Sequence, residues 1–231
     1  MKNFIAIIPA RAGSVGIKDK NIIQICDKPL LAWSIYQAKK SKYIQSVWVS
    51  SDGDNILEIA ESFGAGTIKR PDHISGSDAS SESAWNHAIN EIEKEIGKIH
   101  NVVGLQPTSP IREPEDIDNA INYYMQNDFD SLLTVSEIED YFIWEDGKNG
   151  PHPVNYNLNK RMPRQKINKS FLENGSFYIF KPEILKNFNN RLGGNIGIFT
   201  MAKHKMFQID NHEDIKLCEA IMRGYSLDIY E

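Results

Sequence analysis

The loop that follows the first apolar segment of the chain combines small residues with basic ones. Residues 4–8 contain no polar side chain, which is typical of a buried parallel strand, and Pro9 ends that strand. Small residues let backbone N–H groups approach an anion, while Arg and Lys side chains neutralise its charge. The loop contains Arg11, Ala12, Gly13, Ser14, Gly16, Lys18, Lys20 and Asn21. We therefore predict a phosphate-binding loop; the alternative is an ordinary strand-to-helix turn with basic residues on its surface.

This loop differs from two common phosphate-binding motifs. A Walker loop ends in Gly-Lys-Ser or Gly-Lys-Thr, and dinucleotide-binding folds carry Gly-x-Gly-x-x-Gly. Neither pattern occurs in residues 4–21. The sequence therefore does not indicate a P-loop ATPase or a nicotinamide-dependent enzyme.

Polar residues also follow other predicted strands. Residues 50–52, 106–112 and 210–214 each come directly after an apolar segment. Because the carboxyl ends of parallel strands meet at one edge of a sheet, we expect these groups to converge on the basic loop. Such a site could hold a nucleoside triphosphate, with Arg and Lys on its oxygens and Asp210 on Mg²⁺. Neutral hydrogen-bonding groups for a base or for sugar hydroxyls are offered by Gln106, Thr108 and Ser109.

Each of these polar residues also has an ordinary structural interpretation. Helix capping is the alternative for Asp214, Ser80 and Ser81. A solvated surface position is the alternative for Arg70 and Arg164. Arg112 is expected to form a salt bridge within its own loop rather than to contact a ligand.

Strand and helix patterns alternate along the chain and would position these side chains. Strands are predicted at residues 4–8, 47–51, 66–69, 101–106, 131–135, 177–180 and 206–210. Helices are predicted at residues 30–41, 56–63, from 80 or 81 through 92, 115–124 and 214–223. This alternation predicts an α/β protein with a doubly wound, mostly parallel sheet and ligands at the carboxyl ends of its strands.

An irregular insert interrupts this alternation within what is predicted to be a single domain, residues 1–231. Residues 137–170 are polar and rich in Gly and Pro, and excursions of this length are usually functional. The insert also contains the basic residues Lys160, Arg161 and Arg164, together with four consecutive apolar residues at 141–144. That apolar group needs cover, either from the same sheet or from a partner subunit.

Composition limits the kind of partner. The chain has 231 residues and a net charge of -5, with no basic stripe, which argues against nucleic acid as a ligand. Its two cysteines, Cys26 and Cys218, match no metal or redox spacing and are expected to be packing residues. No apolar segment approaches transmembrane length, and the first strand leaves no room for a signal peptide. A cytoplasmic protein without membrane contact is therefore expected.

The residues singled out above carry a resemblance along nearly the whole chain. Residues 7–14 read Ile-Ile-Pro-Ala-Arg-Ala-Gly-Ser and residues 105–110 read Leu-Gln-Pro-Thr-Ser-Pro, a quite specific combination. Further matching stretches are residues 20–21, 28–32, 49–52, 70–71, 79–81, 163–165, 174–179, 209–210 and 214. The sequence resembles the acylneuraminate cytidylyltransferases, also called CMP-sialic acid synthetases.

This resemblance implies a Rossmann-like nucleotidyltransferase fold and the joining of CMP from CTP to a nine-carbon 2-keto sugar acid, with release of pyrophosphate. CTP contacts are implied for Arg11, Ser14, Lys18, Lys20, Asn21, Arg70 and Ser81. Sugar contacts are implied for Gln106, Thr108, Arg164 and Asn174. Asp210 is implied as a Mg²⁺ ligand, and the catalytic residues as Arg11, Lys20 and Asp210. The resemblance also implies a homodimer in which the insert reaches the neighbouring site.

The sequence departs from the family pattern at three positions. Val15 stands where many members have Lys, so one triphosphate contact is missing unless Lys18 substitutes for it. Gln208 stands where many members have a second Asp, and its uncharged carbonyl oxygen would be a weak metal ligand. Leu172 replaces an Arg found in some sialic-acid members, and enzymes for legionaminic acid share the remaining motifs.

These departures leave alternatives to a sialic-acid cytidylyltransferase. One is a related enzyme for legionaminic acid or another nonulosonate, and a second is a transferase for another sugar and nucleotide. A third, of a different class, is a subunit that binds nucleotide without turning it over. No Ser-His or Cys-His pairing suggests a covalent intermediate, and no residue is assigned as the general base.

Overall fold

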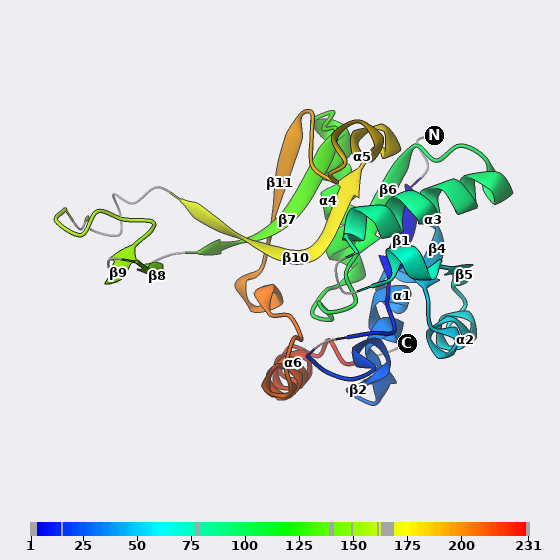
Figure 1. The fold of residues 1–231 in the computed structure, drawn as a ribbon, viewed down its shortest axis with the longest axis horizontal. Coiled ribbons are helices and arrows are strands. Elements are labelled where there is room, and N and C mark those ends of the chain that lie inside the picture. The colour runs from blue at the N-terminus through cyan, green and yellow to red at the C-terminus, as the bar shows by residue number, and fades with distance from the viewer. Residues whose placement is uncertain are drawn as a thin grey trace.

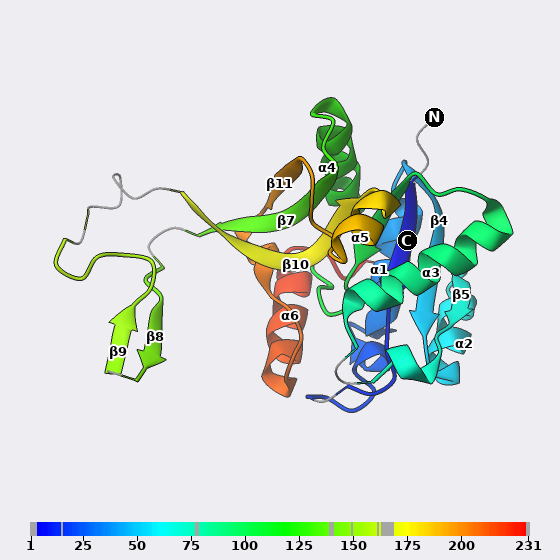
Figure 2. The ribbon, with the colours of Figure 1, turned by 45° about the horizontal axis from the view of Figure 1, so that its top comes forward.

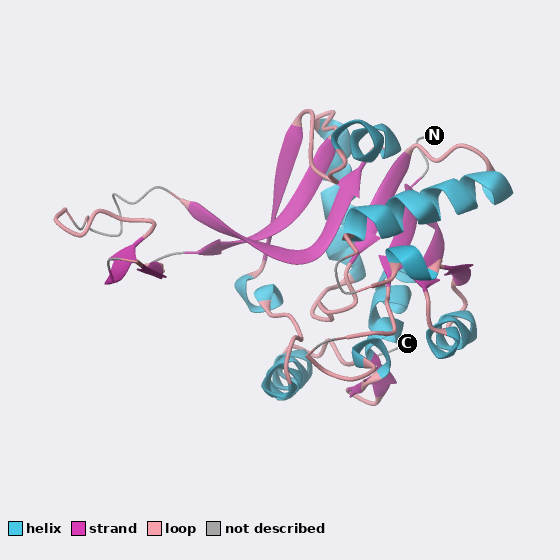
Figure 3. Cartoon of the chain, in the orientation of Figure 1, coloured by secondary structure: helices cyan, strands magenta, loops and turns pink. Residues whose placement is uncertain are grey.

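A seven-stranded, mostly parallel sheet forms the centre of the molecule in the computed structural model (Figures 1 and 3). The structure describes residues 4–14, 16–76, 79–138, 141–148, 150–160, 162 and 169–229. The strand order is β11-β7-β10-β6-β1-β4-β5, and β10 alone in this sheet runs antiparallel to its neighbours. The strands are β1 (Phe4–Pro9), β4 (Ile44–Ser51), β5 (Gly66–Lys69), β6 (Asn101–Leu105), β7 (Ser131–Ile138), β10 (Ser170–Phe180) and β11 (Ile196–Met201). The predicted α/β fold is confirmed.

Helices cover both faces of this sheet. They are α1 (Leu30–Lys40), α2 (Asp54–Ser62), α3 (Ser81–Ile96), α4 (Pro114–Gln126), α5 (Pro182–Phe188) and α6 (His212–Gly224). Shorter 3₁₀ helices are η1 (Lys20–Ile22), η2 (Asp72–Ile74) and η4 (Lys203–Met206). Three-layer packing of this kind buries both faces of a parallel sheet, which explains why its strands lack polar alternation.

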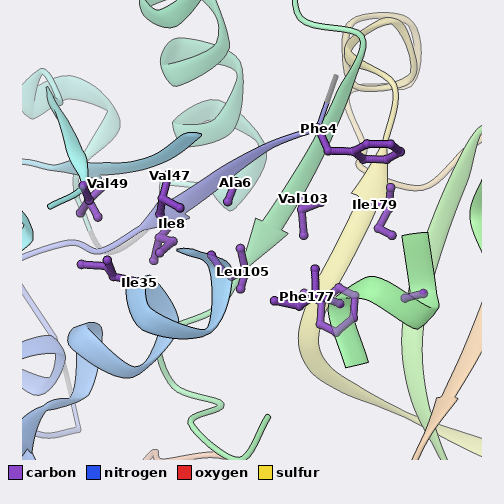
Figure 4. Close-up of a cluster of buried hydrophobic side chains, with 14 of the residues drawn as sticks. Phe4, Ala6, Ile8, Ile35, Val47, Val49, Val103, Leu105, Phe177 and Ile179 are labelled. Atoms are coloured by element: carbon purple, nitrogen blue, oxygen red, sulfur yellow. The ribbon is translucent and has the colours of Figure 1, made fainter. Parts of the chain in front are cut away.

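Alternate residues of β1 show how the two faces are filled. Phe4, Ala6 and Ile8 pack on one face with α1, α2 and α4 (Figure 4). Ile5 and Ile7 pack on the other face with α3 and α5. All five side chains are buried, as the period of two in a strand requires.

The N-termini of two helices bear on the capping interpretation given for Ser80, Ser81 and Asp214. Ser80, not Ser81, is the N-cap of α3, and its hydroxyl accepts a hydrogen bond from the Ser83 N–H at 3.1 Å. Asn211 caps α6, and the Asp214 carboxylate accepts from the Asn211 N–H at 2.9 Å. This reciprocal pair is a capping box, so Asp214 stabilises a helix terminus.

A third cluster of apolar side chains attaches α6 to the small hairpin of β2 (Gln24–Ile25) and β3 (Lys28–Pro29). Cys26 and Cys218 are both in this cluster, buried and with free thiols. Burial raises the pKa of the Cys218 thiol to about 12, which disfavours its reactive thiolate. The prediction that both cysteines are packing residues is confirmed.

The last predicted strand is wrong. Residues 206–210 form no strand; instead η4 leads into a loop, and the Ile209 N–H donates to the Thr108 carbonyl at 2.8 Å. Ile209 is buried because it packs into the cluster of α6, not because it belongs to the sheet. The last strand of the sheet is β11, which the sequence analysis did not identify.

The insert is more ordered than predicted. β7 extends to Ile138 and β10 begins at Ser170, while β8 (Trp144–Gly147) and β9 (Gly150–Pro153) pair as an antiparallel hairpin. Residues 141–148 and 150–160, here called the arm, project beyond the outer ends of β7 and β10, away from the helices that cover the sheet (Figures 1 and 2). None of the helices in the described part of the chain is both long and apolar enough to pass through a membrane.

Candidate active site

A cavity of about 570 Å³ opens beside the carboxyl ends of β1 and β6, where the sequence predicted that polar residues converge. Cavities of this size are typical of sites for small molecules and nucleotides. Its described lining consists of Pro9, Arg11, Ser14, Gly16, Lys20, Asn21, Arg70, Ala79, Ser80, Ser81, Ala84, Gln106, Pro107, Thr108 and Asp210. Residues as far apart in the sequence as Pro9 and Asp210 therefore share one site.

The loop after β1 is held in place by side chains on both of its sides. Buried Asn21 donates through Nδ2 to the Arg11 carbonyl at 2.9 Å, and the Ala12 N–H donates to Asp52 Oδ1 at 2.9 Å. Gly16 lies against the Asp210 carbonyl oxygen, which a Cβ at position 16 would approach to 2.5 Å. Only a residue without a side chain fits there, so this glycine permits the close approach of the loop to Asp210.

Two arginines come together at the cavity from different elements. Arg70 is 5% exposed, and its Nη2 and Nε donate to the Ser50 carbonyl and hydroxyl at 2.6 and 3.2 Å. Arg11 Nη1 donates to the Gly76 carbonyl at 3.3 Å. Burial lowers the pKa of Arg70, Asp52 opposes that effect, and the charge of Arg11 adds to it. Two guanidinium groups that line the same cavity favour the binding of an anion there.

Lys20 and Asp210 form an ion pair in the lining of the cavity. Lys20 Nζ lies 2.9 Å from Asp210 Oδ1 and also donates to the Ile209 carbonyl at 3.1 Å. The Asp210 N–H donates to Asp214 Oδ2 at 2.8 Å, which fixes the backbone that carries the carboxylate. The site therefore brings cationic groups and one carboxylate onto the same cavity.

Neutral polar residues line the end of β6. The Gln106 N–H donates to the Ser176 carbonyl at 3.2 Å, which ties this segment to β10. Gln106 and Thr108 are partly exposed to the cavity, whereas Ser109 is buried and donates to the Gly175 carbonyl at 3.4 Å. Gln106 and Thr108 are thus available for hydrogen bonds with a ligand, and Ser109 is not.

Comparison with known proteins identifies the family. A family model described as cytidylyltransferase matches residues 5–231. The chain is 30% identical to post-translational flagellin modification protein B of Campylobacter coli, over 98% of both chains. It is 29% identical to CMP-N,N'-diacetyllegionaminic acid synthase of Campylobacter jejuni, over 96% of both. It is 32% identical to N-acylneuraminate cytidylyltransferase A of Danio rerio, over 78% of this chain and 42% of that longer protein.

The chain belongs to the cytidylyltransferase family. It is therefore a nucleotidyltransferase, as the motifs indicated. A solved structure of CMP:2-keto-3-deoxy-manno-octonic acid synthetase with CTP superposes with a TM-score of 0.72 at 15% identity, covering 96% of this chain and 99% of that one. At that identity the match supports the fold alone, which is the Rossmann-like nucleotidyltransferase fold.

Most of the predicted site residues of this cytidylyltransferase line the cavity. They are Arg11, Ser14, Lys20, Asn21, Arg70, Ser81, Gln106, Thr108 and Asp210. Lys18 is exposed and does not line the cavity. Arg164, Arg161 and Val15 lie outside the described residues, so their predicted roles stay predictions.

Asn174 and Gln208 are not among the described residues that line the cavity, and both hydrogen-bond to other protein groups. Asn174 is buried, and its Oδ1 accepts from Thr134 Oγ1 at 2.7 Å. Gln208 Nε2 donates to the Asn174 carbonyl at 2.7 Å, next to Gly175, whose φ is +62°. This bond uses the donor side of the Gln208 amide.

Arg112 has a structural role different from the one expected. It is 2% exposed and donates to the Ser176 carbonyl, Ser34 Oγ and Gln37 Oε1 at 2.5, 2.8 and 3.0 Å. Burial lowers its pKa to about 9, against the favourable charge of Asp116. It forms no ion pair with any described residue, so the expected salt bridge is replaced by hydrogen bonds that join α1 to β10.

Asp52 is a residue to which the sequence analysis gave no role of its own. Its carboxylate binds the N–H of Ala12 in the loop and favours the charged form of Arg70. The sequence feature that could have pointed to Asp52 is its position directly after β4, within residues 50–52. The structure makes it a support for the loop and for one of the two arginines.

Proposed function

We propose that this cytidylyltransferase transfers CMP from CTP to a nine-carbon 2-keto sugar acid of the N-acylneuraminate type and releases pyrophosphate. The observation that carries the proposal is the convergence of Arg11, Arg70 and Lys20 on one cavity that also exposes Gln106 and Thr108. Three cations match a triphosphate, and neutral groups match the hydroxyls of a sugar. The names of the relatives in Danio rerio and Campylobacter jejuni support a nonulosonic acid as the acceptor.

In this reaction the anomeric hydroxyl of the sugar acid attacks the α-phosphorus of CTP and releases its proton to solvent water. The bond between the α-phosphorus and its bridging oxygen breaks, and pyrophosphate leaves with that oxygen. Arg11, Arg70 and Lys20 would stabilise negative charge on the phosphates, and Gln106 and Thr108 would orient the sugar. Positioning and electrostatic stabilisation then supply most of the catalysis, without a covalent enzyme intermediate.

We propose Mg²⁺ as the cofactor, held by Asp210 together with the substrate phosphates. No cluster of three or more His, Cys, Asp or Glu side chains suited to a metal exists within the described ranges. One exposed carboxylate fits Mg²⁺, which commonly binds through one or two carboxylates plus phosphate oxygens. Gln208 would contribute at most its amide oxygen, because its Nε2 donates to the Asn174 carbonyl. When bound, Mg²⁺ supplies positive charge that stabilises the phosphates and the leaving pyrophosphate.

A second candidate substrate is a legionaminic acid. The Campylobacter jejuni relative named as a CMP-N,N'-diacetyllegionaminic acid synthase matches over 96% of both chains, whereas the Danio rerio enzyme is matched over less than half of its length. Leu172, which replaces an Arg of some sialic-acid members, is exposed on β10 and is compatible with either acid.

A pyrophosphate-release assay tests the proposal and separates the candidates. Purified protein is given Mg²⁺, each of the four ribonucleoside triphosphates, and either N-acetylneuraminic acid or diacetyllegionaminic acid. We expect release only with CTP, and the acid that gives the higher kcat/KM identifies the substrate. Release with another nucleotide would indicate a different transferase. CTP binding without release for any nonulosonic acid would indicate a non-catalytic subunit.

We also propose that the protein is a homodimer built through the arm. Tyr141, Ile143 and Trp144, which the sequence indicated would need cover, are each 46–48% exposed. Val154 and Leu158 of the arm are 56% and 58% exposed. The arm therefore does not fold back over its own sheet, and a second copy would bury these apolar side chains.

A further inference from the structure

The ion pair between Lys20 and Asp210 places a positive charge where a metal ion would bind. Lys20 Nζ contacts Asp210 Oδ1 at 2.9 Å and the Ile209 carbonyl at 3.1 Å. The Lys20 side chain is 15% exposed, while that of Asp210 is 72% exposed. The Lys20 ammonium group thus donates to one oxygen of the Asp210 carboxylate. Its positive charge repels any dication that approaches the same carboxylate.

Asp210 is fixed by its backbone, whereas Lys20 can change partner. The Ile209 N–H bonds to the Thr108 carbonyl, the Asp210 N–H bonds to Asp214, and Gly16 lies against the Asp210 carbonyl. The Lys20 ammonium, by contrast, ends a flexible four-carbon side chain. It can therefore leave the carboxylate without a change in the fold, provided that another anion replaces its partner.

The triphosphate of CTP would be that anion. Arg11 and Arg70 line the same cavity as Lys20, so phosphates held by these arginines would lie within reach of the lysine. We propose that the ion pair with Lys20 prevents free Mg²⁺ from binding to Asp210. When a nucleoside triphosphate binds, its phosphates attract the Lys20 ammonium group away from Asp210, so that metal and nucleotide bind together. This inference rests on the proposed use of CTP, and it concerns the order and coupling of binding rather than the reaction.

Asp210 is the one carboxylate among the described residues that line the cavity, so a metal that bound there before nucleotide would have to use it. The described residues contain no cluster of three or more His, Cys, Asp or Glu side chains that could hold a metal ion, and Gln208 offers only an uncharged amide oxygen. Coupling between two ligands is reciprocal, so nucleotide should tighten metal binding by the factor by which metal tightens nucleotide binding. A lysine that only contacted phosphate would strengthen nucleotide binding and leave the affinity for free metal unchanged.

Replacement of Lys20 by an uncharged residue should therefore raise the affinity for free metal and lower the affinity for CTP. Mn²⁺, which prefers oxygen ligands as Mg²⁺ does, reports its own binding by the loss of its free-ion electron paramagnetic resonance signal. Without nucleotide, Lys20→Met should bind Mn²⁺ about tenfold more tightly than the parent protein, the effect of one charge roughly 5 Å from a dication in water. The same variant should bind CTP about tenfold more weakly, because it loses a hydrogen bond between charged groups.

Three further variants make the titration decisive. Lys20→Arg keeps the charge and should keep the weak Mn²⁺ binding of the parent. Lys20→Met combined with Asp210→Asn should lose the gained affinity. Lys94→Met removes a lysine from an exposed pair with Glu91 on α3 and should change neither affinity. If Lys20→Met does not fold, as judged by far-UV circular dichroism, Lys20→Gln makes the same test.

Unchanged Mn²⁺ affinity in the folded Lys20 variant would overturn the inference, as would a gain that survives Asp210→Asn. The Mn²⁺ titration requires no CTP, so its outcome is separate from that of the proposed function. A parent protein that releases no pyrophosphate with any acid would contradict the function. Tight Mn²⁺ binding by the parent without nucleotide would contradict only the blocking role of Lys20.

Discussion

Arg11 and Arg70 both line the cavity, and the charge of Arg11 contributes to the lowered pKa of Arg70, so a bound anion would favour both charged guanidinium groups. Arg11→Ala should therefore weaken the use of CTP by about 1.5–3 kcal/mol, or about ten- to 150-fold in kcat/KM. Steady-state pyrophosphate release at varied CTP measures this change. Arg223→Ala, which removes an exposed Arg of α6 outside the cavity, is the control. Unchanged kinetics in a folded Arg11→Ala protein would remove Arg11 from the site.

Gln208 combines two roles that substitution can separate. Its Nε2 donates to the Asn174 carbonyl, while its amide oxygen is the weak metal ligand predicted from the sequence. Gln208→Asp should lower the Mg²⁺ concentration for half-maximal rate, because a second carboxylate would be added near Asp210. The same change should lower the free energy of unfolding by about 1–3 kcal/mol, because the Asn174 carbonyl loses its donor.

Urea unfolding and Mg²⁺ titration of the rate report these two effects independently. Gln208→Met is the matched variant, since it also removes the donor but adds no charge. It should reproduce the loss of stability without the change in Mg²⁺ requirement. If both variants shift the Mg²⁺ requirement alike, the shift comes from loop geometry and not from a metal ligand.

At the scale of elements, Lys205 joins η4 to the start of α4. Its ammonium group is 5% exposed and lies 2.5 Å from Glu113 and 2.6 Å from Asp116. Burial alone would lower the pKa of Lys205, but hydrogen bonds to Asp116 and Glu113 outweigh burial and raise it above its ordinary value. This ion pair anchors the segment that continues into the loop carrying Asp210.

Lys205→Met should therefore lower the free energy of unfolding by about 1–3 kcal/mol at pH 8, because two partly exposed carboxylates lose a charged hydrogen-bond donor. Since the pKa is raised in the folded state, this contribution is complete below the unfolded pKa of about 10.4 and is lost as pH rises through the folded value. Urea unfolding of both proteins between pH 8 and 11.5 measures it, with Lys216→Met as an exposed control. A difference that stays constant up to pH 11.5 would contradict the assignment.

The contrast between β11 and residues 206–210 shows what the sequence could and could not predict about these elements. Residues 206–210 read as a strand because apolar and polar side chains alternate, yet Ile209 is buried against α6. In β11 two large apolar side chains are exposed and the glycine between them is buried. Ile196 and Ile198 are 47% and 44% exposed, and Gly197 is buried because Phe129 leaves no space for a side chain. Tertiary packing, which local periodicity does not report, decided both cases.

The sequence predicted which residues share the cavity better than it predicted the secondary structure that carries them. Arg11, Gln106 and Asp210 share a cavity because the sheet brings together segments that follow different strands, as the topology rule predicts. Asp210 lines this cavity although its predicted strand is a loop, because the Ile209 N–H of that loop donates to the Thr108 carbonyl in the segment after β6. Hydrogen bonds such as that of Asp52 to the Ala12 N–H could not be predicted, because their partners depend on the folded backbone.

At the scale of the whole molecule, the arm is the feature that a monomer explains least well. It carries partly exposed aromatic residues that contact one another, with Phe142 and Tyr156 rings 4.7 Å apart. A dimer would bury this surface, and light scattering should then give about twice the chain mass of 26.3 kDa. Trp144→Lys, on the exposed face of β8, should shift the protein towards the monomer mass. A monomer at all concentrations tested would contradict the dimer.

A shared active site makes a stronger prediction than the mass. In the proposed dimer Arg164, which lies outside the described residues, would approach the sugar carboxylate in the partner's cavity, while Asp210 acts within its own subunit. Arg164→Ala and Asp210→Asn should each lose most activity, because each removes a charge that contacts substrate or metal. Mixing the two folded variants under conditions that allow subunit exchange should restore part of the activity, since one site of each mixed dimer keeps both residues. A mixture no more active than its components would place Arg164 in its own subunit or outside the site.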